Sequence, residues 1–406
     1  MQKLTRQEKS WIAYDVGNSA FVMLSTALIP VYFSSLADPG SSVVVAWGYA
    51  ETVASLILAL LMPFLGSLAD LRHNKKRFLI GSVGTGAVAC AALGIPQHAL
   101  AFLVIYVVSS VMLNGSMVFY DAFLVDATSE DNYDRVSSHG YAWGYIGSCI
   151  PFIASLAIVL FGENVGISMS VGMQIAFIIT ALWWVAFTVP LVRNVHQTHF
   201  KPRTDRLFRD TVRGLVATVR KIFRDKRLLM YMLAYFFYID GVHTIIKMST
   251  SYGTELGIDS TQLVLALLVT QFVAFPSAIL YGRLASKVGT RTMLMTAVLA
   301  YFCITLFAAF FLRTATEFWI LAVCVGLFQG GIQALSRSEF GKLIPKEHAN
   351  EYYGFFDIFG KYAAVMGTFL VSVFTQLTGN ASIGVLAISI LFVAGLVLLW
   401  RMPKEA

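Results

Sequence analysis

Long, uninterrupted runs of apolar residues dominate the chain, and polar residues are concentrated in the gaps between them. A hydrocarbon core of roughly 30 Å needs about 20 residues of helix, because only helices and closed barrels satisfy their backbone hydrogen bonds there. The runs are continuous rather than alternating, which argues against a barrel. The pattern therefore predicts an all-α membrane protein with twelve transmembrane helices, at 11–36, 43–69, 78–96, 99–122, 138–161, 166–191, 228–252, 261–281, 292–312, 316–338, 351–376 and 381–400.

Lys and Arg residues indicate how these helices are oriented, because basic loops are retained on the cytoplasmic side. With the N-terminus inside, the inner segments hold 27 of the 30 Lys and Arg residues, whereas the outer loops hold only Arg313. Lys247 and Lys361 fall within predicted helices. An odd number of helices would remove this asymmetry, so we expect both termini in the cytoplasm.

The chain also repeats itself. GSLADLRHNKKR at 66–77 is matched by GRLASKVGTRTM at 282–293, an offset of 216 residues. Asn114-Gly115 lines up with Gln329-Gly330 at an offset of 215. Matching loops in matching places predict two six-helix bundles in parallel repeat, an arrangement that places a substrate between the halves. We expect an N-terminal bundle at 1–191, a cytoplasmic linker at 192–227 and a C-terminal bundle at 228–406.

Composition supports a membrane protein. Hydrophobic residues make up 57% of the chain and charged residues 13%, which leaves too little polar surface for a soluble globule. A net charge of +7 raises the alternative of nucleic-acid binding, but the basic residues lie between the apolar runs. All four cysteines lie inside apolar stretches without a C-x-x-C spacing, so we expect reduced thiols and neither disulfides nor a metal site.

The segment 192–227 is the one long polar stretch, with 11 basic and 3 acidic residues. We interpret it as a linker whose amphipathic helix lies on anionic lipid headgroups. The alternative, a nucleic-acid-binding arm, is less favoured. His196 and His199 have no acidic or thiol neighbours in sequence, so they do not predict a metal site.

Ionisable and amide side chains inside the predicted helices are candidates for the functional site. A charge near the bilayer centre costs at least about 2.5 to 3.5 kcal/mol, so each one is a functional hypothesis by default. Asp240, His243 and Lys247 stand at i, i+3 and i+7 and share one face of the seventh helix. Three further stripes follow helical spacing: Asp15 with Asn18, Gln329 with Gln333 and Arg337, and Asp357 with Lys361.

Asp15 is the residue that we expect to couple protons or to hold a solute ammonium, since a desolvated carboxylate binds either one favourably. Gln329 and Gln333 suit a zwitterionic or hydroxylated solute, although amides also bridge helices in bundles. Asp357 and Lys361 favour a structural ion pair over substrate contact. Each of these groups has a purely structural alternative.

A patterned loop joins the second and third predicted helices and is copied more weakly between the eighth and ninth. Its residues are Gly66, Leu68, Asp70, Lys75 and Lys76, with Gly282, Leu284 and Arg291 in the second copy. They resemble the signature loop of the major facilitator superfamily, except that Leu71 and His73 replace a basic residue and a glycine. The resemblance implies that Asp70 holds a cytoplasmic gate closed, and we expect Lys75 and Arg337 to gate with it.

Four longer motifs are more specific: WIAYDVGNSAFVM (11–23), FYIDGVHTIIKMSTSYGTELG (237–257), GLFQGGIQALSRSEFGKLIP (326–345) and GFFDIFGKYAAVMG (354–367). Together they resemble the vacuole-effluxer-like branch of that superfamily, which is related to the autophagy-associated permeases. For eukaryotic relatives the resemblance implies amino-acid efflux. It also implies that the first, fourth, seventh and tenth helices line a central cavity, so we expect Asn18, His243 and Lys247 to bind solute or protons beside Asp15, Asp240 and the two glutamines.

These patterns predict a secondary active transporter of a small polar metabolite, such as an amino acid, with protons as the candidate coupling ion. We expect a monomer in a bacterial inner membrane, without a cofactor. The alternatives are an uncoupled facilitator or drug exporter, and a non-transporting receptor or scaffold that docks a partner through 192–227. No phosphate-binding loop, G-x-S-x-G or H-E-x-x-H motif is present, so we do not expect an enzyme.

Overall fold

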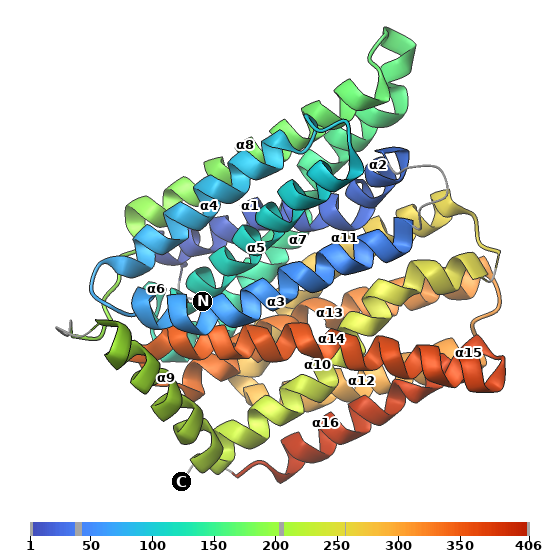
Figure 1. Ribbon diagram of the computed structural model, residues 1–406. Helices are drawn as coiled ribbons and strands as arrows, with labels where there is room; N and C mark the ends of the chain where they lie inside the picture. The colour runs from blue at the N-terminus through green and yellow to red at the C-terminus, as the bar shows by residue number, and fades with distance from the viewer. Residues whose placement is uncertain (1–2, 37–42, 203–206, 256, 404–406) are drawn as a thin grey trace. The chain divides into compact units, whose positions relative to one another are not determined.

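The computed structural model describes residues 3–36, 43–202, 207–255 and 257–403. Within these ranges the chain forms helices and no strand, which confirms the all-α prediction (Figure 1). The α-helices, with the labels of Figure 1, are α1 (Arg6–Ala27), α2 (Ile29–Leu36), α3 (Val43–Ala69), α4 (Asn74–Ala92), α5 (Ala99–Ala122), α6 (Leu124–Ala127), α7 (Tyr133–Phe161), α8 (Met169–Asn194), α9 (Leu207–Arg224), α10 (Lys226–Glu255), α11 (Ser260–Val288), α12 (Thr290–Phe310), α13 (Ala315–Leu343), α14 (Ala349–Thr378), α15 (Ala381–Ala387) and α16 (Ser389–Arg401).

Nine helices in the described part of the chain are long and apolar enough to cross a membrane. They comprise α3, α5, α7, α8, α10, α11, α12, α13 and the continuous α15–α16 segment. The other three predicted spans overlap α1 with α2, α4, and α14. Lys75, Lys76 and Arg77 lie in the first turn of α4, and the described part of α14 contributes a shorter apolar stretch, Met366–Thr378. Twelve spans therefore remain a prediction.

The chain divides into two compact units, which we call unit 1 and unit 2. Unit 1 comprises Met1–Ser129, Trp143–Val212 and Pro345–Gly354, and unit 2 comprises Glu130–Ala142, Arg213–Ile344 and Phe355–Ala406. These units differ from simple N- and C-terminal halves in two short segments. The first residues of α7 belong to unit 2, and the first residues of α14 belong to unit 1.

Both units use the same pattern of helix packing. In unit 1, α5 packs against α3 and α4, and α8 packs against α1 and α4. In unit 2, α13 packs against α11 and α12, and α16 packs against α10 and α12. The neighbours occur in the same chain order in each unit, as an internal repeat of loops and helices requires.

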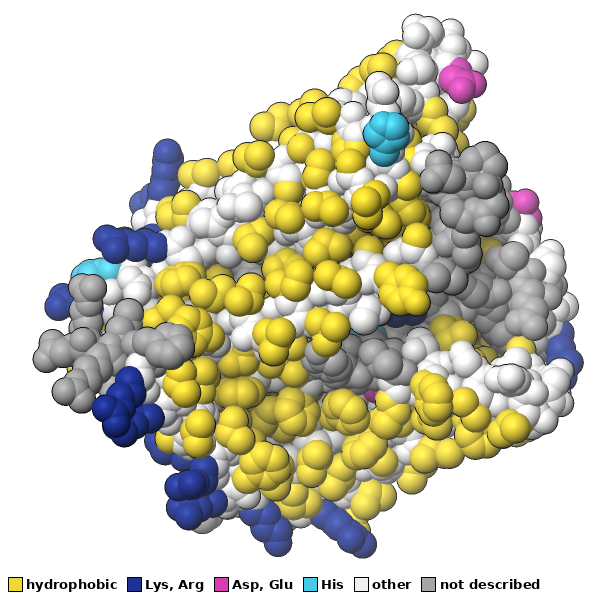
Figure 2. Space-filling model, viewed as in Figure 1, with side chains coloured by type: hydrophobic (Ala, Val, Ile, Leu, Met, Phe, Trp, Pro, Cys, Tyr) yellow, Lys and Arg dark blue, Asp and Glu magenta, His cyan; other side chains and the backbone are white. Residues whose placement is uncertain are grey.

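Large apolar side chains cover the outward faces of the helices. Leu60 is 79% exposed, Val88 is 72% exposed and Leu182 is 65% exposed. On the face shown in Figure 2, hydrophobic side chains spread over the helices, whereas Lys and Arg side chains gather at its edges. A soluble monomer rarely exposes so much contiguous apolar surface, and lipid chains are its natural solvent.

Two glycines let the backbones of helices approach closely within each unit. A Cβ atom added to Gly66 would lie 2.6 Å from the Asn350 carbonyl oxygen in unit 1. One added to Gly282 would lie 2.6 Å from the Ser138 Cβ and 3.0 Å from the Asp134 carbonyl oxygen in unit 2. The offset of 216 that relates the two glycines also relates Asp134 to Asn350. In each repeat, a glycine near the end of a helix thus packs against the start of a helix from the other repeat.

We predict that Gly66→Ala and Gly282→Ala each lower the free energy of unfolding by about 1 to 3 kcal/mol, because backbone atoms have to move to admit the methyl group. Thermal unfolding in detergent micelles measures the effect. Gly81→Ala and Gly84→Ala are matched controls on α4, since a Cβ at either position meets no atom within 4 Å. Melting temperatures of Gly66→Ala and Gly282→Ala equal to those of the controls would contradict the close-approach interpretation.

Candidate functional site

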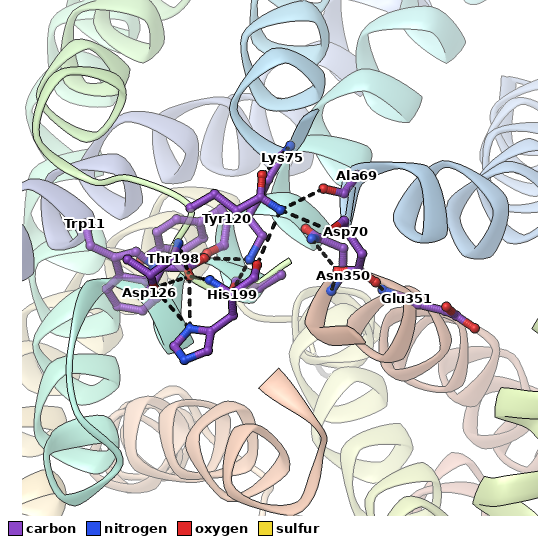
Figure 3. Close-up of polar contacts among 12 residues, drawn as sticks. Trp11, Ala69, Asp70, Lys75, Tyr120, Asp126, Thr198, His199, Asn350 and Glu351 are labelled. Atoms are coloured by element: carbon purple, nitrogen blue, oxygen red, sulfur yellow. Dashed lines mark hydrogen bonds and ion pairs between the residues drawn. The ribbon is translucent and has the colours of Figure 1, made fainter. Parts of the chain in front are cut away.

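Asp70 lies in the turn after α3 and caps the start of α14. Its Oδ1 accepts hydrogen bonds from the Asn350 backbone N–H at 2.9 Å and from Asn350 Nδ2 at 2.7 Å, and its Oδ2 accepts one from the Glu351 N–H at 3.1 Å (Figure 3). The first amides of a helix have no partner within the helix, and a carboxylate there also interacts favourably with the helix dipole. Asp70 is thus an N-terminal cap supplied from 280 positions earlier in the chain.

A lysine from the linker lies beside this cap. Lys201 Nζ forms an ion pair with the Glu351 carboxylate and lies 3.6 Å from Asp70 Oδ2. The side chains of Asp70 and Glu351 are almost fully buried, at 1% and 0% exposure. Burial raises the pKa of Asp70, and the ammonium groups of Lys201 and Lys75 offset that effect only in part.

Lys75 forms a buried ion pair with Asp126, which follows α5. The Lys75 Nζ lies 2.6 Å from Asp126 Oδ2, and neither side chain is exposed. The other carboxylate oxygen of Asp126 accepts hydrogen bonds from the Thr198 N–H at 2.8 Å, the Thr198 Oγ1 at 2.7 Å and the His199 N–H at 2.9 Å (Figure 3). Asp126 thereby fastens the start of the linker to unit 1.

The ionisation of Asp126 is set by these partners. Burial alone raises the pKa of its carboxyl group, but the Lys75 ammonium and the hydrogen bonds from His199 and Thr198 outweigh burial. The net effect holds the pKa of Asp126 well below its usual range. The folded protein therefore strongly favours the ionised form.

Unit 2 contains a corresponding polar cluster at the start of α7. Asp134 accepts hydrogen bonds from Ser338 Oγ at 2.6 Å and Thr290 Oγ1 at 2.7 Å, and its Oδ2 lies 2.7 Å from Lys342 Nζ. All four residues belong to unit 2. This cluster fixes the first turn of α7 against α12 and α13.

Arg337, a predicted gating residue on α13, extends the same cluster. Its Nε donates to Ser137 Oγ at 2.9 Å, and its Nη2 donates to the Ser137 carbonyl oxygen at 3.0 Å. The guanidinium group lies 4.4 Å from the ring centroid of Tyr141, within range for a cation–π contact. Arg337 is only 1% exposed and makes all of these contacts with the start of α7.

Asp15 and Asn18 lie together on α1, as their spacing predicts. Asp15 Oδ2 accepts a hydrogen bond from the Tyr120 hydroxyl at 2.7 Å, and its Oδ1 accepts one from Asn18 Nδ2 at 3.4 Å. The Trp11 ring stacks on Tyr120 with centroids 4.4 Å apart (Figure 3). Asp15 and Asn18 are 3% and 1% exposed, so unit 1 encloses this carboxylate among aromatic rings.

Asp240 lies on α10 with no exposed surface. Its Oδ1 accepts hydrogen bonds from the Gly367 N–H at 2.9 Å and from Thr244 Oγ1 at 3.3 Å. Its Oδ2 has no hydrogen-bond partner among the residues that the structure describes. His243 is half-buried and Lys247 is exposed, so the predicted stripe runs from a buried acid to an exposed cation.

The remaining predicted residues lie in unit 2. Gln329 is 7% exposed and Gln333 is half-buried on α13, on the stripe that ends at Arg337. Asp357 is half-buried on α14. The side chain of Lys361 lies outside the described residues, so its ion pair with Asp357 stays a prediction.

Several residues of these clusters were not predicted from the sequence. Asp126, Asp134, Lys201, Lys342 and Glu351 all lie in or next to segments predicted on the inner side of the membrane. Their partners are distant in sequence, and helical spacing relates only residues on one helix. The repeat offset of 216 does pair Asp134 with Asn350, and this signal could have drawn attention to both helix starts.

We predict that acidification destabilises the protein through Asp126. Its folded-state pKa lies below the unfolded value of about 3.9, so its contribution to stability is fully present above that value and is lost progressively as the pH falls from there toward the folded-state pKa. Melting temperatures of wild type and Asp126→Asn are measured from pH 7 down to pH 3, and the difference between them should begin to narrow below about pH 4. The pKa of Asp70 is shifted in the opposite direction. Because both proteins retain Asp70, its contribution to the pH dependence of stability cancels in the comparison. A constant difference across the range would contradict the prediction.

Comparison with known proteins gives one family. The family model described as "Vacuole effluxer Atg22 like" matches residues 40–406. An uncharacterized MFS-type transporter of Bacillus subtilis, YxiO, is 45% identical over 100% of this chain and 96% of its own length. Autophagy-related protein 22 of Cryptococcus neoformans (strain JEC21) is 26% identical over 67% of this chain and 50% of its own length.

Solved structures of major facilitator transporters share the fold. The human organic anion transporter MFSD10 has a TM-score of 0.75 at 15% identity and covers 97% of this chain, with 99% of its own chain matched. The transporter FucP in its outward conformation has a TM-score of 0.73 at 12% identity, with 98% of each chain matched. At these identities the likeness concerns the fold alone.

Proposed function

We propose a function from one premise: this chain belongs to the vacuole effluxer Atg22-like family of the major facilitator superfamily, a family of membrane transporters rather than enzymes. The function is secondary active transport of a small polar metabolite that carries an amino group, such as an amino acid. Protons are the proposed coupling ion. Transport proceeds by alternating access, as unit 1 and unit 2 rock.

The buried carboxylate of Asp240 is the observation that carries this proposal. Its Oδ2 accepts no hydrogen bond from any described residue, although the side chain has no exposed surface. An unpartnered carboxylate oxygen inside a membrane helix is costly. A proton or a solute ammonium supplies the missing partner, so Asp240 is proposed to alternate between them.

Further polar groups make an amino acid a better candidate than an apolar drug. Asp15 offers a second buried carboxylate, which Tyr120 and Asn18 hold in place. Gln329 and Gln333 add amide donors and acceptors for a solute carboxylate. Lys247 and His243, on the same helix as Asp240, add positive charge when protonated.

The two clusters at the starts of α14 and α7 are proposed to act as gates. Each one holds the first turn of a helix whose remaining residues belong to the other unit. Both contacts lie on the predicted cytoplasmic side, so opening of that side is proposed to release Asp70 from the start of α14 and Arg337 from the start of α7. Lys75 supports the first gate through Asp126.

The proposed setting is a bacterial inner membrane, with both termini in the cytoplasm and the protein acting as a monomer. The 45% identical relative from Bacillus subtilis supports a bacterial plasma membrane. The distribution of Lys and Arg supports the orientation. An uncoupled facilitator or drug exporter remains the alternative within transport, and a receptor or scaffold is the alternative outside it.

We predict that Asp240→Asn, Asp15→Asn and Gln333→Ala each lower amino-acid flux by about tenfold or more, equivalent to about 1.4 kcal/mol of lost interaction. A thermal-shift screen of a metabolite panel first identifies the solute, because a ligand that binds only the folded state raises its stability. Flux into proteoliposomes is then measured for each variant. Glu163→Gln, at an exposed position in the short Gly162–Val165 3-10 helix, is the matched acid-to-amide control.

Four outcomes of flux and cellular measurements separate the alternatives. Flux that falls when the proton gradient is collapsed supports coupling, whereas equilibrating flux that persists identifies a facilitator. Wild-type flux from all three variants rejects the site assignment. A protein that moves no member of the panel but loses its cellular function when 192–227 is shortened fits a scaffold.

Helix α9 is proposed to dock on anionic lipid. At 3.6 residues per turn its side chains fall into three neighbouring sectors. One sector is buried and contains Thr211, Thr218 and Ile222. The next is apolar but exposed and contains Val212, Val216, Val219 and Phe223. The third is exposed and basic and contains Arg209, Arg213, Arg220 and Arg224. An apolar sector beside an arginine sector suits acyl chains beside phosphates.

We predict that replacing the four arginines of α9 with glutamine weakens binding of phosphatidylglycerol, since each basic residue near an anionic surface contributes about 1 kcal/mol. Binding of a fluorescent phosphatidylglycerol to the purified protein in neutral micelles measures the loss. A fluorescent phosphatidylcholine serves as the control and should bind both proteins alike. Equal phosphatidylglycerol binding by the variant and wild type would contradict the assignment.

A further inference from the structure

Two buried carboxylates share the cap of α14 and need a compensating charge. Asp70 and Glu351 are 1% and 0% exposed, and both contact the same lysine. An uncompensated buried carboxylate is strongly destabilising, so the source of the cation decides whether the cap forms. His348 lies 3.7 Å from Glu351, but it belongs to the same helix start and cannot fasten that start to unit 1.

The basic residues of the Asp70 loop itself are engaged elsewhere. Arg72 lies over the Phe200 ring, with 5.4 Å between the guanidinium carbon and the ring centroid. Lys75 is paired with Asp126. Lys76 Nζ lies 3.3 Å from His196 Nδ1, and Arg77 is exposed. The position that follows Asp70 is occupied by Leu71, which has no charge.

The linker supplies a compensating positive charge, and hydrogen bonds of its backbone fix the position of that charge. The Lys201 N–H donates to the Asp70 carbonyl oxygen at 2.8 Å, and Lys201 forms a parallel bridge with Leu71. Three residues before Lys201, Thr198 binds Asp126 through both its N–H and its hydroxyl. These anchors place the Lys201 ammonium beside both carboxylates, so its position does not depend on a free, flexible linker.

We propose that Lys201 is a gating residue. The linker places the Lys201 ammonium group in the cap of α14. This group supplies the positive charge that Leu71, in the Asp70 loop, does not provide. This inference rests on the proposed alternating access. When the start of α14 leaves unit 1, Glu351 leaves with it, whereas Asp70 and Lys201 remain in unit 1. Lys201 therefore stabilises one state of the gate selectively, by its contact with Glu351.

The test measures release of the α14 start without any substrate. Ala349 is fully buried at the first position of α14, so Ala349→Cys reports release by its reaction with a polar maleimide. The four native cysteines are replaced by serine or alanine in the full-length protein. Labelling rates in micelles are compared for the parent, Lys201→Met and Lys201→Arg. Lys76→Met is the control that removes a neighbouring lysine with other contacts.

We expect Lys201→Met to raise the labelling rate about tenfold or more, a shift of about 1.4 kcal/mol in the gate equilibrium. Lys201→Arg and Lys76→Met should stay near the parent rate. Adding Leu71→Lys to Lys201→Met should lower the rate again, because the cation returns beside Asp70 from the loop. Adding Glu351→Gln instead should also lower it, because one of the two buried acids beside the substituted lysine is gone.

Parent-like labelling of Lys201→Met would overturn the proposal. The proposal would also be overturned if Lys201→Met and its two double variants, with Leu71→Lys or with Glu351→Gln, were labelled at the same rate. If the role of Lys201 were purely structural, a positive charge at another position would not restore it. If Lys201→Met does not fold, the comparison is made between Lys201→Gln and its two double variants. Labelling requires no solute, so these outcomes stay separate from failure of the flux experiment, which would reject the proposed function alone.

Discussion

The cost of a buried charge governs the arrangement of this protein. In a low-dielectric interior an ion without partners is strongly destabilising, so each buried acid has to be compensated by cations, hydrogen bonds or a ligand. Asp126 is compensated by Lys75 and the start of the linker, and Asp134 by Lys342 with two hydroxyl groups. Asp240 retains an oxygen that no described residue satisfies. Asp240 thus differs from Asp126 and Asp134, and it is the acid proposed to bind solute.

The same constraint links the repeat to the proposed gates. Gly66 and Gly282 lie near the C-terminal ends of α3 and α11 and give matching helix starts room to approach. The charges at the two contacts are arranged differently. In unit 1 the loop itself contributes the acid, Asp70, whereas in unit 2 the acid, Asp134, comes from the helix start. The two contacts therefore need not have equal strength, and an alternating-access cycle needs the two states to differ only modestly in free energy.

Much of the fold and part of the site followed from the sequence. Apolar run length predicted the all-α membrane fold, and helical spacing placed Asp15 beside Asn18. Spacing did not reveal Tyr120 as the second partner of Asp15, because a residue 105 positions away lies on another helix. Lys75 was predicted as a gating residue from a resemblance, and its ion pair with Asp126 depended on how α4 packs against the end of α5.

The sequence by itself determined that the chain is an all-α membrane protein and which family it belongs to, because hydrophobic run length and local motifs are properties of consecutive residues. Tertiary structure alone decided which buried charges are neutralised and by what. Charge compensation acts through space over a few ångströms, and the partners here, such as Asp70 with Asn350 or Lys201 with Glu351, are 280 and 150 positions apart. No local pattern records such a pairing.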